Sequence, residues 1–161
     1  MDDTTPPIDP SSRSGAPLGR AAGPADADTR ATIDRLAVKR GLLLGNMSRS
    51  DQLATLALAA RCLPTGPACT EAAVNAALKA WLAGTGAMLR IDYVELRRAL
   101  IDAGLWQRDG FGRAYERAHT FVEPTLAAHV EALATDPPEA RIEGLRAEAA
   151  AERARRKALV A

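Results

Sequence analysis

The sequence predicts a mainly α-helical protein built on a winged helix-turn-helix, that is, three helices followed by a β-hairpin wing, with a C-terminal helical extension. Three amphipathic segments with capping residues follow one another between positions 48 and 104. The Asp109-Gly110 pair then separates two short runs, LWQR and RAYER, and is a strong hairpin signal. A hairpin placed directly after a third helix is typical of a winged helix.

Composition and charge narrow the functional class. The 161 residues are 47% hydrophobic and 25% charged, which suits one globular domain with tails. The formal net charge of +1 creates no strong field for nucleic acid or an anionic membrane, so such an attraction has to be local. Cys62 and Cys69 form no CxxC pair, which indicates no disulfide framework. There is no signal-peptide pattern and no apolar run near the ~20 residues of a membrane span. We therefore expect a cytoplasmic protein that does not enter a membrane.

Two segments precede the domain. Residues 1–28 are rich in Pro, Ser, Gly and Asp and offer little to bury, so we expect a disordered tail. Residues 29–45 are expected to form a leader helix, with Thr29 as its N-cap and Gly41 and Gly45 as its stops.

Residues 46–118 are expected to form the winged helix-turn-helix, and its first two helices have clear boundaries. Ser48 begins the first helix, and Pro64 ends it. Thr70 is the N-cap of the second. Each helix carries one apolar stripe at helical spacing. The stripes are Leu53, Leu56, Ala57, Ala60 and Leu63, and then Val74, Ala77, Leu78, Trp81 and Leu82.

The third helix and the wing complete this domain. After a flexible AGTGAM link, Asp92 caps a helix whose apolar side is Tyr93, Leu96, Leu100 and Ala103. Gly104 is placed to end that helix in the left-handed conformation. The wing follows over residues 105–117, with Gly112 giving the turn extra freedom.

Residues 119–161 are expected to form a helical extension. Thr120 and Glu123 make a capping box that opens a helix through Val122, Leu126, Val130 and Leu133. Asp136-Pro137-Pro138 breaks it, and Pro138 takes the first position of an alanine-rich last helix. That helix has a thin stripe of Ile142, Leu145 and Ala149 and a basic end of Arg153, Arg155, Arg156 and Lys157. We interpret the basic end as a solvated helix terminus rather than a nucleic-acid tail.

Three blocks of residues carry a resemblance. They are T-E-x-x-V-N-x-x-L from Thr70, D-x-x-x-L-R-R-x-L-I-D-x-G-L from Asp92, and R-D-x-x-G-x-x-Y-x-R from Arg108. Together they resemble a prokaryotic domain of unknown function, family twenty eighty-seven, over about residues 53–117. The chain departs from the pattern in its AGTGAMLRI spacer and at Trp106, where an aliphatic residue is usual. The resemblance implies a winged-helix-like module, found alone or attached to ArsR-type helix-turn-helix regulators, with no established activity.

The candidate contacts lie on the third helix and the wing. Arginine can read guanine and hold phosphate. The candidates for DNA or partner contact are Arg97, Arg98, Arg108, Arg113, Arg117 and Trp106. Carboxylates at Asp92, Glu95 and Asp102 leave the third helix locally neutral. Val94 and Ile101 suggest a second apolar strip for a partner. The residues leave duplex DNA and a protein partner, either a regulator or a second copy, as open alternatives, and the resemblance favours transcriptional regulation.

Structural roles compete for the same residues. Arg98 can pair with Asp102 at the i+4 position, and Arg97 with an acidic group across the domain. The polar residues for which a structural role is expected are Asn75, Asp92, Asp102 and Tyr115, and Asn75 is placed to fasten the second helix to the third helix or the wing. Trp81 and Trp106 are more often core than contact residues. There is no nucleotide-loop motif, and His119 and His129 lack zinc-ligand spacing. We therefore expect a non-enzymatic protein without a cofactor or metal.

Overall fold

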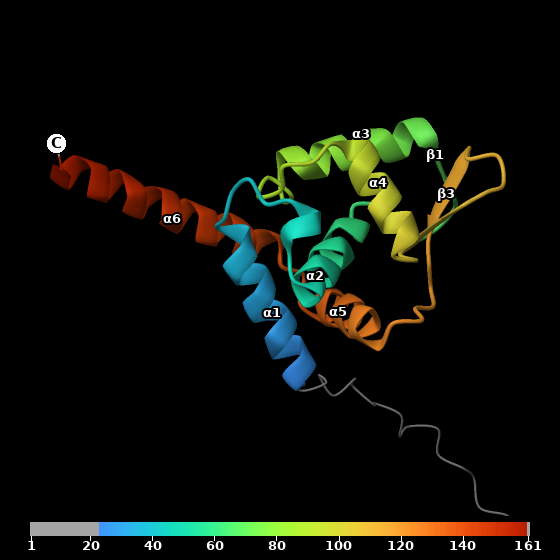
Figure 1. Ribbon diagram of the computed structural model, residues 1–161, viewed down its shortest axis with the longest axis horizontal. Helices are drawn as coiled ribbons and strands as arrows, with labels where there is room; N and C mark the ends of the chain where they lie inside the picture. The colour runs from blue at the N-terminus through green and yellow to red at the C-terminus, as the bar shows by residue number, and fades with distance from the viewer. Residues whose placement is uncertain (1–22, 161) are drawn as a thin grey trace, which may run out of the picture.

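A computed structural model describes residues 23–160 of the chain, and these residues are mainly helical with a small three-stranded antiparallel sheet (Figure 1). The predicted tail lies outside the described residues up to position 22. The elements are α1 (Pro24–Ala37), a 3-10 turn η1 (Leu44–Asn46), α2 (Arg49–Ala60), β1 (Cys69–Thr70), α3 (Glu71–Ala83), α4 (Tyr93–Asp102), β2 (Trp106–Arg108), β3 (Ala114–Arg117), α5 (Pro124–Thr135) and α6 (Glu139–Val160).

The order of these elements is consistent with a winged helix. The strands lie in the order β1-β3-β2, with Cys69 opposite Tyr115 and Trp106 opposite Arg117. The predicted hairpin is therefore confirmed, and β1 is an addition that the sequence did not indicate. β1 has two residues, too few for a visible alternation, and it joins the sheet through β3, about forty-five positions further along the chain.

Helix α2 forms the centre of the protein. Every residue from Leu53 to Ala60 is buried, although the sequence predicted a single apolar stripe. Figure 1 shows why, because α1 and α5 cover one side of α2 while α4 lies on the other. The small side chains of Ala54, Ala57 and Ala59 allow neighbouring helices to approach closely on all sides.

The extension is joined to α2 by polar contacts as well as by apolar packing. The Arg61 guanidinium, just beyond α2, donates to both carboxylate oxygens of Glu139, at 2.9 and 3.4 Å, and to the Leu133 carbonyl at 2.8 Å. Arg49, at the other end of α2, pairs with Glu123 at 2.7 Å. Both ends of α2 are thereby fixed to α5 and α6, and the extension is part of the same packed body.

The predicted starts of α2, α3 and α4 are confirmed at atomic detail. The Ser48 hydroxyl accepts the Asp51 amide, and the Thr70 hydroxyl accepts the Ala73 amide. The Asp92 carboxylate accepts the amides of Val94 and Glu95, both at 2.8 Å. Gly104, just after α4, has φ +72°, the left-handed conformation that glycine adopts without strain. Local capping chemistry therefore determines where these helices begin and where α4 ends.

The loop of the hairpin is longer than the Asp109-Gly110 pair suggested. It runs over residues 109–113, and Gly112, with φ +69°, is the residue that takes the left-handed conformation. One carboxylate oxygen of Asp109 accepts the amides of Arg113 and Ala114, at 2.7 and 3.2 Å. Asp109 therefore closes the loop through its side chain. Gly110 lies in the turn that the Gly112 amide closes on the Asp109 carbonyl at 3.0 Å, but it does not take a positive φ.

The link between α3 and α4 is held in place, so the expectation of a flexible AGTGAM segment is wrong. Gly86 lies against the Trp81 ring so closely that a Cβ there would come within 2.2 Å of it. Leu89 forms a parallel bridge to Leu42. Arg146 of α6 donates to the carbonyls of Gly84 and Thr85, at 2.8 and 2.7 Å. Distant segments fix this glycine-rich link, and its composition alone gives no sign of them.

The outer helices begin at different residues from those predicted. Helix α1 starts at Pro24 rather than Thr29, because proline suits the first position and the Asp26 carboxylate accepts the Gly23 amide at 2.7 Å. It ends at Ala37, before Gly41 and Gly45. Helix α5 starts at Pro124, after Glu123, and makes no capping box with Thr120. Val122 is fully exposed and not part of its apolar side.

The predicted break between α5 and α6 is confirmed, and α6 is the most extended element. Helix α6 starts at Glu139, so Pro138 precedes its first position. Ile142 is buried, whereas every residue from Ala151 to Val160 is exposed. Figure 1 shows the second half of α6 projecting from the body. The basic end is exposed to solvent, as expected.

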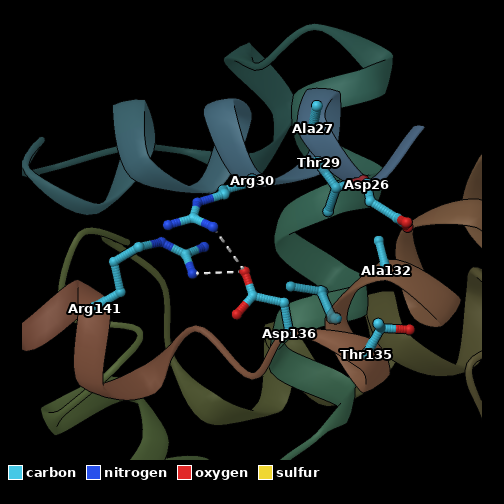
Figure 2. Close-up of a pocket in the computed structure, with 9 residues that line it drawn as sticks. Asp26, Ala27, Thr29, Arg30, Ala132, Thr135, Asp136 and Arg141 are labelled. Atoms are coloured by element: carbon cyan, nitrogen blue, oxygen red, sulfur yellow. Dashed lines mark hydrogen bonds and ion pairs between the residues drawn. The ribbon is translucent and has the colours of Figure 1, made fainter. Parts of the chain in front are cut away.

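Helices α1, α5 and α6 line a small, partly open cavity of about 180 Å³. Figure 2 shows Arg30 of α1 and Arg141 of α6 converging on Asp136, at 3.5 and 3.0 Å. Arg141 also pairs with Asp34 at 2.7 Å. These ion pairs join residues in or next to the cavity wall to one another, so the charges of the paired side chains are already neutralised.

A buried polar pair lies beside this cavity. Thr29, predicted as an N-cap, is inside α1, and its hydroxyl donates to the Ala25 carbonyl at 2.9 Å. That donation uses the single hydroxyl hydrogen, so His129 Nδ1, 2.8 Å away, is the donor to Thr29. His129 Nε2 is buried and has no partner among the described residues. Burial lowers the pKa of His129, because a charged ring here would hold an unpaired N–H.

The stability of the protein is expected to fall in mild acid because of His129. A lowered pKa in the folded state means that the unfolded chain binds more protons below about pH 6.5, the ordinary histidine value. The free energy of unfolding should therefore stay constant above that pH and decline as the pH drops toward the pKa of His129 in the folded state. Urea denaturation at several pH values between 5 and 8 measures this free energy. His129→Gln should flatten this part of the profile, whereas His119→Gln, at an exposed position, should not; an unchanged profile in His129→Gln would refute the assignment.

Candidate functional site

The outward side of α4 is a shallow groove with an excess of negative charge. We call it the α4 face. It is lined by Asp92, Val94, Glu95, Arg98, Ala99 and Asp102, and its volume is about 470 Å³. Three carboxylates therefore surround one guanidinium. Asp92 and Glu95 sit at the start of α4, where the helix dipole stabilises negative charge. The face is acidic, although the sequence had suggested a locally neutral helix.

Arg97 is turned away from that face and belongs to the interior. Its Nη1 donates to Glu71 at 2.8 Å and to the Asn75 side-chain oxygen, and its guanidinium lies 5.8 Å from the centre of the Tyr115 ring. The side chain is only 16% exposed. Arg97 therefore fastens α4 to α3 and β3. The expected pairing of Arg97 with an acidic group and the fastening role of Asn75 are confirmed, and Arg97 is not available as an outer contact.

Trp106 is a core residue, so its place among the candidate contacts is corrected. It is 1% exposed, and its indole N–H donates to the Ala60 carbonyl at 3.3 Å, at the end of α2. A large ring at the first position of β2 fills the space between the sheet and α2. The structure thus agrees with the core role that the sequence favoured for Trp106; a three-residue strand has no alternation to follow, so a contact role had stayed open.

Arg117 lies at the base of the wing rather than near its loop. Burial lowers the pKa of Arg117, and the charge of Arg61 lowers it further. Burial also raises the pKa of the neighbouring Cys62 thiol to about 12, so this cysteine is a neutral, unreactive group. Arg117 is therefore partly buried and does not share the exposed surface of Arg108 and Arg113.

The exposed part of the wing combines cations with an aromatic ring. Arg108 and Arg113 are exposed, and Phe111 is 80% exposed at the loop. The Arg113 guanidinium lies 4.8 Å from the centre of the Phe111 ring. The Asp109 carboxylate accepts hydrogen bonds from amides of the loop, and these lower its pKa; the Arg113 amide makes the largest contribution. Phe111 was not among the sequence candidates, although an aromatic between two glycines in a hairpin loop is a signal for exposure.

The structure separates the remaining candidates into two places. Arg98 is exposed on the acidic α4 face, and no hydrogen bond or ion pair joins it to Asp102 among the described residues. Arg108 and Arg113 lie on the wing. Val94 lines the α4 groove, whereas Ile101 packs against the core, so the two do not form one exposed strip. Within residues 23–160, no three His, Cys, Asp or Glu side chains could share a metal ion.

Comparison with known proteins identifies the central domain. Residues 46–117 match the model of a family described as an uncharacterized protein conserved in bacteria (DUF2087), which confirms the resemblance carried by the three motif blocks. No curated protein and no solved structure matches the chain. None of the helices in the described part is both long and apolar enough to cross a membrane.

Proposed function

We propose, from the family of residues 46–117 and the charge of the α4 face, that this chain is a non-enzymatic winged-helix module of bacterial transcriptional regulation that acts through a protein partner. The observation that carries the proposal is the acidity of the α4 face. A helix that enters the major groove passes between two rows of phosphates, and three carboxylates around Arg98 would oppose that approach. The same charges favour a partner segment that carries lysine or arginine.

DNA binding through the wing is the second candidate, and one observation favours it. Arg108 and Arg113 are exposed, and Arg113 lies beside Phe111; a cation next to an exposed aromatic ring suits contact with phosphate and sugar. In this arrangement the wing would hold the backbone without reading the bases, because the α4 face would remain outside the groove. Binding would therefore be sensitive to salt and indifferent to sequence.

The partner proposal is tested by charge reversal on the α4 face. The wild-type chain, Glu95→Lys and Glu148→Lys are each used to capture proteins from a lysate of the source bacterium, and the bound proteins are identified by mass spectrometry. We expect a regulator that binds the wild-type chain and Glu148→Lys and is lost with Glu95→Lys. Both positions are exposed, and Glu148 lies on α6, so the control carries the same charge change elsewhere. Capture that is equal for all three chains would contradict the proposal.

Fluorescence anisotropy with duplex DNA separates the two candidates. Random duplex and the DNA that flanks its own gene are titrated over a salt series with the wild-type chain, Arg98→Gln and Arg113→Gln. The partner proposal predicts that Arg98→Gln leaves any binding and its sequence preference unchanged. Loss of about 1–3 kcal/mol of sequence preference in Arg98→Gln would instead mean base recognition by α4. Uniform weakening in Arg113→Gln, with a salt slope lower by about one, would support phosphate contact by the wing.

A further inference from the structure

A second charged surface lies on the opposite part of the molecule from the wing, where the end of α1, the α3–α4 link and α6 meet. It is a cleft of about 350 Å³, which we call the basic cleft. Its lining contains four cationic side chains and four apolar ones and no carboxylate. The lining residues are Ala37, Val38, Lys39, Arg40, Ala87, Met88, Arg146 and Arg153.

Arg146 is the fixed point of the basic cleft. Its Nε donates to the Ala37 carbonyl at 2.9 Å, and its two terminal nitrogens donate to Gly84 and Thr85 and approach Met88 Sδ at 3.5 Å. A guanidinium has five N–H groups, and these contacts use four, so one hydrogen on Nη1 has no partner among the described residues. The Arg146 side chain is thus held in place by its contacts, while one of its N–H groups has no acceptor among the described residues.

The positive charge of the cleft is not compensated within the described part of the chain. No ion pair joins Lys39, Arg40, Arg146 or Arg153 to a described carboxylate; Arg153 donates only to the Ala149 carbonyl of its own helix, at 3.0 Å. The partners of Arg146 are three carbonyl oxygens and the Met88 sulfur, none of which carries a full charge. Burial lowers the pKa of Arg146, and the charge of Arg40 lowers it further. The cations therefore repel one another, and a bound anion would relieve that repulsion.

The geometry points to a ligand with both a phosphate group and an apolar part. We propose that the basic cleft binds a small phosphorylated molecule of the nucleotide class, with its phosphates on Arg40, Arg146 and Arg153 and its apolar part against Val38 and Ala87. Guanidinium groups hold phosphate oxygens through paired, charge-assisted hydrogen bonds. The volume lies within the range of small-molecule sites, whereas a surface that only tracks a nucleic-acid backbone needs no apolar floor.

This site would be independent of the α4 face. Its residues come from α1, the α3–α4 link and α6, and most lie outside residues 46–117. A ligand that bridges α6 to α1 and the link would stabilise the folded state in proportion to its concentration. The site can therefore be tested on the full chain whatever partner the α4 face contacts.

The test is isothermal titration calorimetry of the full chain with inorganic pyrophosphate and with ATP, in EDTA and low salt. The variants are Arg40→Gln and Arg153→Gln, and the control is Arg155→Gln, which removes the same charge from an exposed position of α6 that does not line the cleft. We expect ATP to bind more tightly than pyrophosphate because of the apolar floor. Arg40→Gln and Arg153→Gln should each weaken ATP by about tenfold, as for the loss of one charge-assisted hydrogen bond. Arg155→Gln should change it less than twofold.

Three results would overturn the proposal. The first is the absence of heat with both anions. The second is equal weakening by Arg155→Gln and Arg40→Gln, which would mean attraction by net charge alone. The third is that ATP and pyrophosphate fail to bind while duplex DNA binds and Arg40→Gln weakens that binding. The basic cleft would then hold the phosphates of a nucleic-acid backbone rather than those of a small molecule. Arg40 makes no hydrogen bond or ion pair within residues 23–160, so thermal unfolding of Arg40→Gln should match that of the wild-type chain and exclude a folding defect.

Discussion

Removal of residues 118–161 is expected to unfold the rest of the chain. Helix α5 covers the side of α2 that α4 leaves open, and Leu126 and Leu133 of α5 and Ile142 of α6 are buried. Each such side chain contributes about 1.5–3 kcal/mol by its burial, and the exposed flank of α2 adds to the loss. The total approaches the ~5–15 kcal/mol by which a whole domain is stable. Circular dichroism should show no cooperative thermal transition for the shortened chain.

A second truncation provides the control. Removal of residues 151–161 deletes described side chains that are all exposed, so the melting temperature of the body should stay within about 2 °C of the wild-type value. If the chain shortened at residue 117 melted cooperatively at the wild-type temperature, α2 would not need the extension. The central role of α2 would then be wrong.

Trp106→Ala is expected to cost about 3–5 kcal/mol of unfolding free energy, because it empties the largest fully buried side-chain position. It also leaves the Ala60 carbonyl at the end of α2 without its indole donor. Trp106→Phe should lose less, since it keeps a ring and removes mainly the hydrogen bond. Urea denaturation monitored by far-UV circular dichroism gives both values.

Phe111→Ala is the matched control for the loss of an aromatic side chain. Phe111 is 80% exposed on the neighbouring loop, so its removal should change the unfolding free energy by less than about 0.5 kcal/mol. Equal effects at the two positions would contradict the assignment of Trp106 to the core. They would also return Trp106 to the candidate contacts of the wing.

Features that depend on neighbours in sequence could be predicted, and those that depend on distant segments could not. Thr70 and Asp92 cap helices through amides two or three residues away, so their patterns are sufficient. The burial of α2 on all sides requires α5, which follows more than sixty positions later. Periodicity shows which side of a helix is apolar, but a run of alanines leaves open whether the other side is also covered.

The same limit applies to the candidate site. Arg97 and Arg98 are adjacent on one helix, yet one is held by Glu71 and Asn75 of α3 while the other is exposed. Only the packing of α3 on α4 determines which of the two arginines is held and which is exposed. The basic cleft combines Arg40, Ala87 and Arg153 from three segments, and no motif joins them in sequence. Only the fold brings these residues together.

The projecting half of α6 affects how unfolding of this protein has to be followed. Residues 151–160 are all exposed, although Arg153 lines the basic cleft, so their helical state rests mainly on alanine-rich propensity and on the Glu152–Arg156 pair, at 2.8 Å, rather than on packing. Such a helix frays gradually on heating. Far-UV ellipticity therefore sums a sloping local transition and a sharp global one, whereas the buried indoles report the global one alone. The two signals will not coincide even if the body unfolds in a single step.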